Sequence, residues 1–167
     1  MPIVVRTEET GDADAIFAVH RACFPTDAEA RLVDALRAAG RLTISLVALA
    51  DGEIVGHVAF SPVTTADGKT GLGLAPLAVM EQNRRQGIGA HLVRMGLLAC
   101  KSAEFGWAVV LGDPAYYSRL GFQPAANLGL SDEFGGGIHF QATELIPGQL
   151  PNGAGLVCYA PEFSALV

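Results

Sequence analysis

The chain has 167 residues, of which 50% are hydrophobic and 17% charged, a composition typical of one compact folded domain and unlike a disordered tail, a coiled coil or a collagen-like rod. Its 11 basic and 17 acidic side chains give a formal net charge of −6, which argues against a general nucleic-acid or anionic-membrane binder, because both need clustered Lys and Arg. Glycine is abundant, with 20 residues, so the first question is which close backbone approaches the glycines permit.

The sequence contains no predicted targeting or membrane-spanning segment. The first residues show no cationic stretch followed by a long apolar run, so we expect no secretory signal. The longest apolar runs, such as residues 44–50, are far shorter than the ~20 residues that a membrane span needs. Cys23, Cys100 and Cys158 lack paired spacing, so we expect neither a disulfide framework nor a zinc site. These features predict a reduced, cytoplasmic protein with no metal and no membrane or nucleic-acid partner.

Hydrophobic periodicity in the first half of the chain predicts two helices set between strands. The predicted elements are a strand over residues 3–6, helices over 12–24 and 27–37, and strands over 43–50 and 53–60. The Asp51-Gly52 pair between the last two strands is a strong hairpin signal, so we expect those strands to be antiparallel. A further strand over 72–80 contains Pro76, and because proline cannot donate to a sheet ladder, we expect a bulge there or a splay from the neighbouring strand.

The second half of the chain begins with a long, largely apolar helix. Its predicted elements are that helix over 87–104, strands over 107–111, 138–145 and 155–160, and a short helix between Asp113 and Gly121. Asp113 is typical of an N-cap, Pro114 of the first helical position and Gly121 of the residue that follows a last turn. The Gly135–Gly137 triplet favours a hairpin turn over a mobile lid. No repeat or linker divides the chain, so we predict a single domain over residues 1–167.

The most informative stretch joins the strand that ends near Met80 to the long helix. It reads Arg84-Arg85-Gln86-Gly87-Ile88-Gly89. Glycines let a ligand approach the backbone, the first helical N–H groups lack internal partners, and the helix dipole is positive at this end, so the loop is suited to bind a pyrophosphate. The alternative is that the glycines serve close packing of the helix on the sheet while the arginines face solvent. The residues alone leave both interpretations open.

Two well-known glycine loops do not match this stretch. A dinucleotide fingerprint needs a third glycine where Leu92 stands, and a Walker loop needs a Gly-Lys-Ser/Thr ending. The pattern that does match, [Q/R]-x-x-G-x-[G/A], resembles the acyl-CoA pyrophosphate loop of the GNAT N-acetyltransferase superfamily. A second motif follows in the expected order, with Tyr117 four residues before Gly121-Phe122. The sequence around both motifs resembles the YhbS-like branch of this superfamily, and the resemblance covers most of the chain.

The resemblance implies a fold of the α+β class with α/β/α layers, in which helices flank a mixed, mostly antiparallel central sheet that is splayed at the acyl-CoA site. It also implies acetyl-CoA as the co-substrate, no metal, and transfer of an acetyl group to a primary amine. The residues that it assigns to acetyl-CoA binding are Leu77, Ala78, Val79, Arg84, Arg85, Gln86, Gly87, Ile88, Gly89, Ala90 and Tyr117.

Three of these residues are candidates for catalysis. By similarity to the superfamily, the backbone N–H of Ala78 or Val79 is expected to stabilise the oxyanion of the reacting thioester. The Tyr117 phenol is expected to protonate the leaving thiolate, the alternative being that Tyr117 only packs. Helical spacing places Tyr116 on one face with Leu120, so we expect Tyr116 to have the core role.

No residue is identified as the general base. Asp113 favours a structural cap, Glu29 a solvated helix face, and His57 a packed or surface position on its strand. The remaining histidines show no partner pattern, and the helical cysteines do not resemble activated nucleophiles. We therefore expect the amine to attack acetyl-CoA directly, without an acyl-enzyme.

Three functions remain open at this point. The first is an enzyme that acetylates an unidentified small-molecule or peptide amine, with a possible homodimer as the assembly. The second is a catalytically idle acyl-CoA-binding module or sensor, which the lack of an obvious base keeps open. The third is acetylation of a protein or a charged tRNA, which the net charge of −6 disfavours for tRNA because like charges repel.

Overall fold

The computed structural model describes residues 2–166, and the chain divides into two compact units. The first unit contains the described chain up to Phe60, then Pro76–Gly96 and the segment from Pro161. The second unit contains Ser61–Ala75 and Leu97–Ala160. The single domain expected from the sequence stays a prediction.

The first unit is built on an antiparallel meander. β1 (Ile3–Thr7) pairs with β2 (Ile44–Ala50), and β2 pairs with β3 (Glu53–Thr65), both in the antiparallel sense. Asp51 and Gly52 both have positive φ, 52° and 78°, which is the geometry of a two-residue type I′ hairpin, so the predicted hairpin is confirmed. The last part of β4 (Thr70–Val79) also belongs to this unit, where the Met80 N–H donates to the Val55 carbonyl at 2.8 Å.

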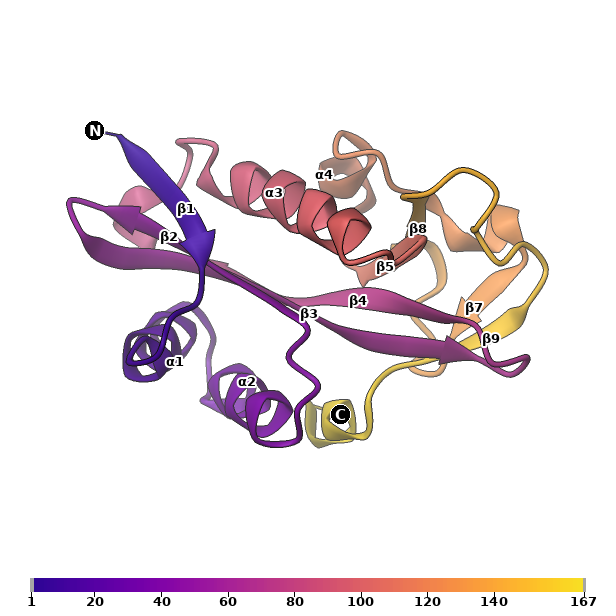
Figure 1. Cartoon of the computed structure of the whole chain (residues 1–167), viewed down its shortest axis with the longest axis horizontal. Helices are drawn as coiled ribbons and strands as arrows, with labels where there is room; N and C mark the ends of the chain where they lie inside the picture. The colour runs from indigo at the N-terminus through magenta and orange to yellow at the C-terminus, as the bar shows by residue number, and fades with distance from the viewer. Residues whose placement is uncertain (1, 167) are drawn as a thin grey trace. The chain divides into compact units, whose positions relative to one another are not determined.

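Helices cover both faces of these strands (Figure 1). α1 (Ala13–Cys23) and α2 (Ala28–Ala38) lie on one face, and the start of α3 (Ile88–Ser102) lies on the other. Alternation along β3 explains the arrangement: a Cβ built on Gly56 would lie 3.1 Å from Leu92 of α3, whereas the next residue, His57, contacts His20 of α1. Two short 3₁₀ turns, η1 (Glu81–Asn83) and η4 (Pro161–Leu166), complete the unit.

The second unit combines parallel and antiparallel pairs. β4 pairs in parallel with β5 (Trp107–Leu111), and β5 pairs antiparallel with β8 (Phe140–Glu144), which also pairs antiparallel with β6 (Gln123–Pro124). β9 (Gly155–Cys158) is antiparallel to the end of β3 and parallel to β7 (Leu130–Asp132). The helical segments of this unit, apart from the end of α3, are α4 (Pro114–Ser118), η2 (Ala125–Leu128) and η3 (Gly137–His139). The mixed, mostly antiparallel sheet with flanking helices confirms the predicted α+β class.

The structure tests the expectations for Pro76 in β4 and for the Gly135–Gly137 segment. The ladder between β4 and β5 covers Leu72–Leu74 and, within the described residues, does not extend to Pro76, in agreement with the loss of pairing that an interior proline causes. The hairpin turn expected at Gly135–Gly137 is wrong, because β7 pairs with β9 and β8 with β5. The segment instead folds around Asp132, whose carboxylate accepts from the backbone N–H groups of Phe134 and Gly136.

Two glycines on β4 are explained by aromatic rings that pack against them, one from Trp107 of β5 and one from Tyr159, the residue after β9. A Cβ on Gly71 would lie 2.5 Å from the Trp107 ring, and one on Gly73 would lie 2.8 Å from the Tyr159 ring. Both distances are shorter than side-chain packing allows, so each ring occupies the space that a larger residue would need.

Candidate active site

The loop that follows β4 is exposed and lies in the first unit. Arg84, Arg85, Gln86 and Gly87 are all exposed, and α3 begins at the next residue. The Arg84 side chain is held by its Nε, which donates to the Val79 carbonyl at 2.9 Å. This bond ties the loop to the last residue of β4, so Arg84 has a structural role in addition to the phosphate contact expected for it.

Gly87 has the backbone conformation that favours glycine. Its φ is +78°, and no heavy atom lies within 4 Å of a Cβ built on it. The Gly87 carbonyl accepts from the His91 N–H at 3.0 Å, so Gly87 stands at the start of α3, where the following N–H groups lack partners within the helix. Open space, N–H groups without a partner inside the helix, and the exposed Arg85 next to them fit an anionic phosphate group.

The end of β4 is anchored from two directions at one carbonyl oxygen. Besides the Arg84 side chain, the Cys23 thiol of α1 donates to the Val79 carbonyl at 3.3 Å. Ala78, the residue before it, is buried, and its carbonyl oxygen lies 3.3 Å from the position of a Cβ built on Gly56 of β3. A close approach by the neighbouring strand and by α1 therefore holds the segment in which the oxyanion donors are expected.

Tyr117 lies in the second unit, whereas the other predicted site residues lie in the first. Its side chain is 8% exposed, packs edge-on against Phe122 at 5.6 Å, and has its pKa raised to about 12 by burial and by the neighbouring Tyr116. The phenol therefore stays protonated at neutral pH and remains a hydrogen-bond donor. Asp113 caps this helix by accepting from the Ala115 N–H at 3.0 Å, which confirms the predicted cap.

The expectation for Tyr116 is wrong. Tyr116 is 38% exposed, and Tyr117 is the buried member of the pair. The spacing argument fails because α4 ends at Ser118, before Leu120, so Tyr116 and Leu120 do not share a helix face.

A chain of buried polar side chains crosses the first unit from α1 to the loop after β1. His20 Nε2 lies 2.7 Å from His57 Nδ1, and His57 Nε2 lies 2.8 Å from Ser45 Oγ, which donates to the Glu8 carboxylate at 2.6 Å. Because Ser45 gives its proton to Glu8, its oxygen accepts from His57 Nε2, and His57 Nδ1 must then accept from His20 Nε2. His20 Nδ1 is left unprotonated, and it has no hydrogen-bond partner among the described residues.

Burial sets the charge state of both histidines. It lowers the pKa of His20 to about 4, and it lowers the pKa of His57 well below its ordinary value, with electrostatic interactions with His20 and Arg37 acting in the same direction. At the far end, burial raises the pKa of Glu8, but hydrogen bonds from Arg37 and Ser45 outweigh it and hold that pKa below its ordinary value. The sequence analysis missed this chain, because His20 and His57 are distant in sequence and meet only when α1 packs on β3.

Three further findings concern cysteine reactivity, metal binding and membrane crossing. Burial raises the pKa of the Cys100 thiol to about 12, so this cysteine is not an activated nucleophile. Among residues 2–166, no cluster of three or more His, Cys, Asp or Glu side chains is arranged to hold a metal ion. Over the same residues, no helix combines the length and the apolar character that crossing a bilayer requires.

Comparison with known proteins decides the family. Residues 41–124, which include the Arg84–Gly89 loop and Tyr117, match the model of the acetyltransferase (GNAT) domain. The chain belongs to the GNAT acetyltransferase family. It is 44% identical to the uncharacterized N-acetyltransferase YhbS of Escherichia coli (strain K12), over 97% of this chain and 99% of that protein.

Solved structures of GNAT proteins have the same fold. A crystal structure of E. coli YhbS in complex with CoA superposes with a TM-score of 0.93 at 42% identity, covering 97% of this chain and 92% of that one. A GNAT acetyltransferase from Brucella melitensis in complex with acetyl-CoA has a TM-score of 0.81 at 36% identity, covering 97% and 98% of the two chains. These matches agree with the acetyltransferase fold predicted from the two motifs.

Proposed function

We propose that this GNAT protein transfers the acetyl group of acetyl-CoA to a primary amine by direct attack. The observation that carries the proposal is the exposed loop over residues 84–87, in which Gly87 has a φ of +78° and open space beside it at the start of α3. Membership of the GNAT family and two related proteins solved with CoA or acetyl-CoA support acetyl-CoA as the co-substrate.

The residues proposed to bind acetyl-CoA have separate roles. Backbone groups of Leu77–Val79 are suited to the pantetheine arm, because the β4 edge is not paired with β5 beyond Leu74 among the described residues. The segment Arg84–Ala90 is suited to the pyrophosphate, through its N–H groups, the exposed arginines and the positive end of the α3 dipole.

The proposed chemistry uses backbone donors and one phenol. The N–H of Ala78 or Val79 stabilises the oxyanion that forms when the neutral amine attacks the thioester carbonyl. The carbon–sulfur bond then breaks, and the Tyr117 phenol, protonated at neutral pH, gives its proton to the leaving thiolate and regains one from water. The amine proton goes to solvent, since no side chain is assigned as the base.

The second candidate function is an acyl-CoA-binding module without turnover. The observation that favours it is the absence of an assigned base, because the two buried histidines resist protonation. Free-thiol release from acetyl-CoA in the presence of a panel of primary amines separates the two candidates. Thiol release that depends on the amine supports the enzyme, whereas acetyl-CoA binding without thiol release on any amine supports the module.

The proposal also covers the cellular location, the partners and the assembly of the protein. We infer a cytoplasmic location, supported by three free cysteines, Cys23, Cys100 and Cys158. We propose that neither nucleic acid nor a membrane is a partner, in keeping with the net charge of −6. The homodimer stays a proposal, for which light scattering of the purified chain is the direct measurement.

A further inference from the structure

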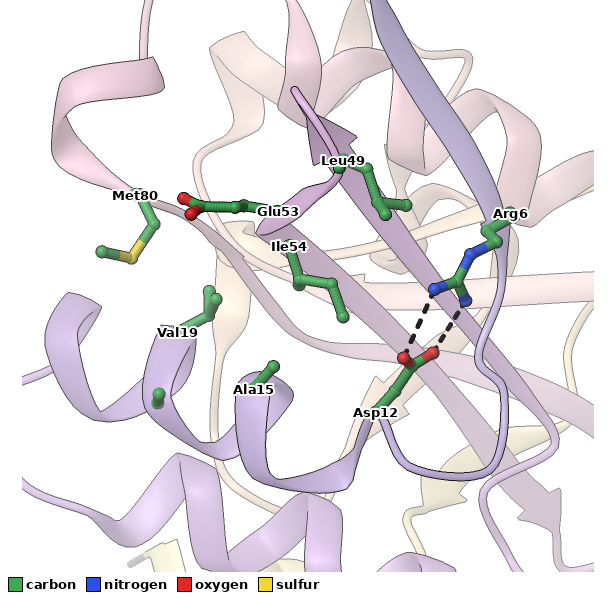
Figure 2. Close-up of a pocket in the computed structure, with 10 residues that line it drawn as sticks. Arg6, Asp12, Ala15, Val19, Leu49, Glu53, Ile54 and Met80 are labelled. Carbon is green, nitrogen blue, oxygen red and sulfur yellow. Dashed lines mark hydrogen bonds and ion pairs between the residues drawn. The ribbon is translucent and has the colours of Figure 1, made fainter.

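The first unit contains a cavity that neither predicted motif lines. Its volume is about 430 Å³, and it lies between α1, the β2–β3 hairpin and the end of β4 (Figure 2). The residues that line it are Arg6, Asp12, Ala15, Ala18, Val19, Leu49, Gly52, Glu53, Ile54 and Met80. A volume of this size is in the range of small-molecule sites, about 300–1,000 Å³.

The walls of the cavity are apolar, and small residues leave the space open. Val19, Leu49, Ile54 and Met80 supply aliphatic and thioether surface. On α1 the lining position Ala18 is exposed, and its methyl group does not fill the space as a larger side chain would. The body of a matching ligand is therefore apolar, because it replaces water against these side chains.

The charged groups of the cavity leave an excess of one negative charge. Arg6 and Asp12 neutralise each other through an ion pair of 2.7 Å, and the same hydrogen bond holds the pKa of Asp12 below its ordinary value, so Asp12 stays ionised. Glu53 is different, because no cationic side chain among the described residues lies within ion-pair distance of it. In Figure 2 its carboxylate points toward Met80, away from the Arg6–Asp12 pair. The charge that complements this site is a single cation at the Glu53 end.

We propose that this cavity binds an alkylammonium ion, with its apolar body against Leu49 and Ile54 and its cationic nitrogen beside Glu53. A primary alkylamine is protonated at neutral pH, so a ligand of this class has both properties that the cavity requires. Met80 directly follows Ala78 and Val79, the residues expected to hold the thioester carbonyl. Resting on the proposed function, we further assign the cavity to the acceptor amine before it loses its proton.

The binding experiment uses three probes of equal length and different charge. Hexylamine, hexanol and hexanoate are titrated into the full chain at pH 7.5 by calorimetry, and hexylamine is expected to bind most tightly and hexanoate most weakly. The Glu53→Gln variant should bind hexylamine about two- to fivefold more weakly, as expected for loss of one exposed ion pair. The Glu53→Lys variant should remove the preference for hexylamine over hexanoate.

A steric variant tests the same cavity independently of charge. Ala18→Leu should abolish hexylamine binding by filling the space, whereas Ala22→Leu, at an exposed position of α1 that does not line the cavity, should bind hexylamine like the unmodified chain. Equal affinity for the three probes, or unchanged hexylamine binding by Ala18→Leu, would overturn the proposal.

A turnover assay distinguishes alkylammonium binding in the cavity from the role of the cavity as the acceptor site. With hexylamine as acceptor, Ala18→Leu should raise the KM for the amine at least tenfold while the affinity for acetyl-CoA, measured separately, stays unchanged. Hexylamine binding that Ala18→Leu abolishes, without thiol release from acetyl-CoA, supports the alkylammonium site and overturns its assignment to the acceptor. If the unmodified chain does not bind acetyl-CoA, the proposed function is contradicted, and the proposal for the cavity is not.

Discussion

The buried pair His20 and His57 makes the stability of the folded chain depend on pH. Both imidazoles are neutral in the folded state, because burial lowers their pKa values, to about 4 for His20 and well below the ordinary value for His57. In the unfolded chain a histidine titrates near 6.5, so below that pH the unfolded state binds protons that the folded state does not. Acid therefore favours unfolding, and the loss begins as the pH falls below about 6.5.

The size of the effect follows from the shift of His20. A fall from an ordinary value of 6.5 to about 4 corresponds to a total of roughly 3 kcal/mol, at about 1.4 kcal/mol for each pH unit. Between pH 7.5 and pH 5 the unfolded histidine becomes protonated and the folded one does not, which accounts for about 2 kcal/mol of that total. His57 acts in the same direction. Carboxylates titrate mainly below this window, so the histidines dominate within it.

Urea unfolding at several pH values between 7.5 and 5 measures this directly. The free energy of unfolding of the unmodified chain should fall by about 2 kcal/mol or more across this range. A double variant with His20→Leu and His57→Leu should lose most of the pH dependence, even if it is less stable at pH 7.5. His91→Gln, at an exposed position of α3, is the matched control and should keep the full dependence. A flat profile for the unmodified chain, or an unchanged slope in the double variant, would refute the reasoning.

Three further predictions concern the proposed acetyl-CoA site and the packing of β4. Tyr117→Phe should lower kcat about 100-fold or more while CoA binding measured by calorimetry is retained, and full turnover would exclude the acid role. Gly87→Ala should weaken CoA binding about tenfold through strain at its φ of +78°, whereas Gly68→Ala, with a φ of +85° and equally open space, should leave the affinity for CoA unchanged. Gly73→Ala should destabilise the chain by about 1–3 kcal/mol in urea unfolding, because the new methyl group would lie 2.8 Å from the Tyr159 ring; a stability equal to that of the unmodified chain would contradict this packing.

The features that the sequence analysis predicted correctly depend on residues close together in the chain. The Asp51-Gly52 hairpin, the Asp113 cap and the start of α3 after Gly87 each follow from a few consecutive residues whose backbone preferences agree. The same is true of the family, since each of its two motifs is a short local stretch. The interpretation of Tyr116 failed for the opposite reason: it assumed a helix long enough to include Leu120, and α4 ends at Ser118.

The features that were missed depend on long-range packing. His57 is a single polar residue in an apolar strand, and nothing in its neighbourhood indicates that His20 of α1 donates to it or that Ser45 accepts from it. The strands β6 and β7 are only two and three residues long, too short to show a period of two. The role of Gly73 likewise depends on the Tyr159 ring, far along the chain.

The sequence by itself therefore determined the acetyltransferase family and the fold class, and it predicts a loop suited to a pyrophosphate, because these inferences depend on local patterns of glycine, arginine and apolar residues. Only the tertiary structure decided which of Tyr116 and Tyr117 is buried and which buried histidines are hydrogen-bonded to each other. It also decided where an apolar cavity opens that contains one carboxylate without an ion-pair partner among the described residues. These depend on the distances between side chains brought together by packing, and such distances are set by the whole fold and not by spacing along the chain.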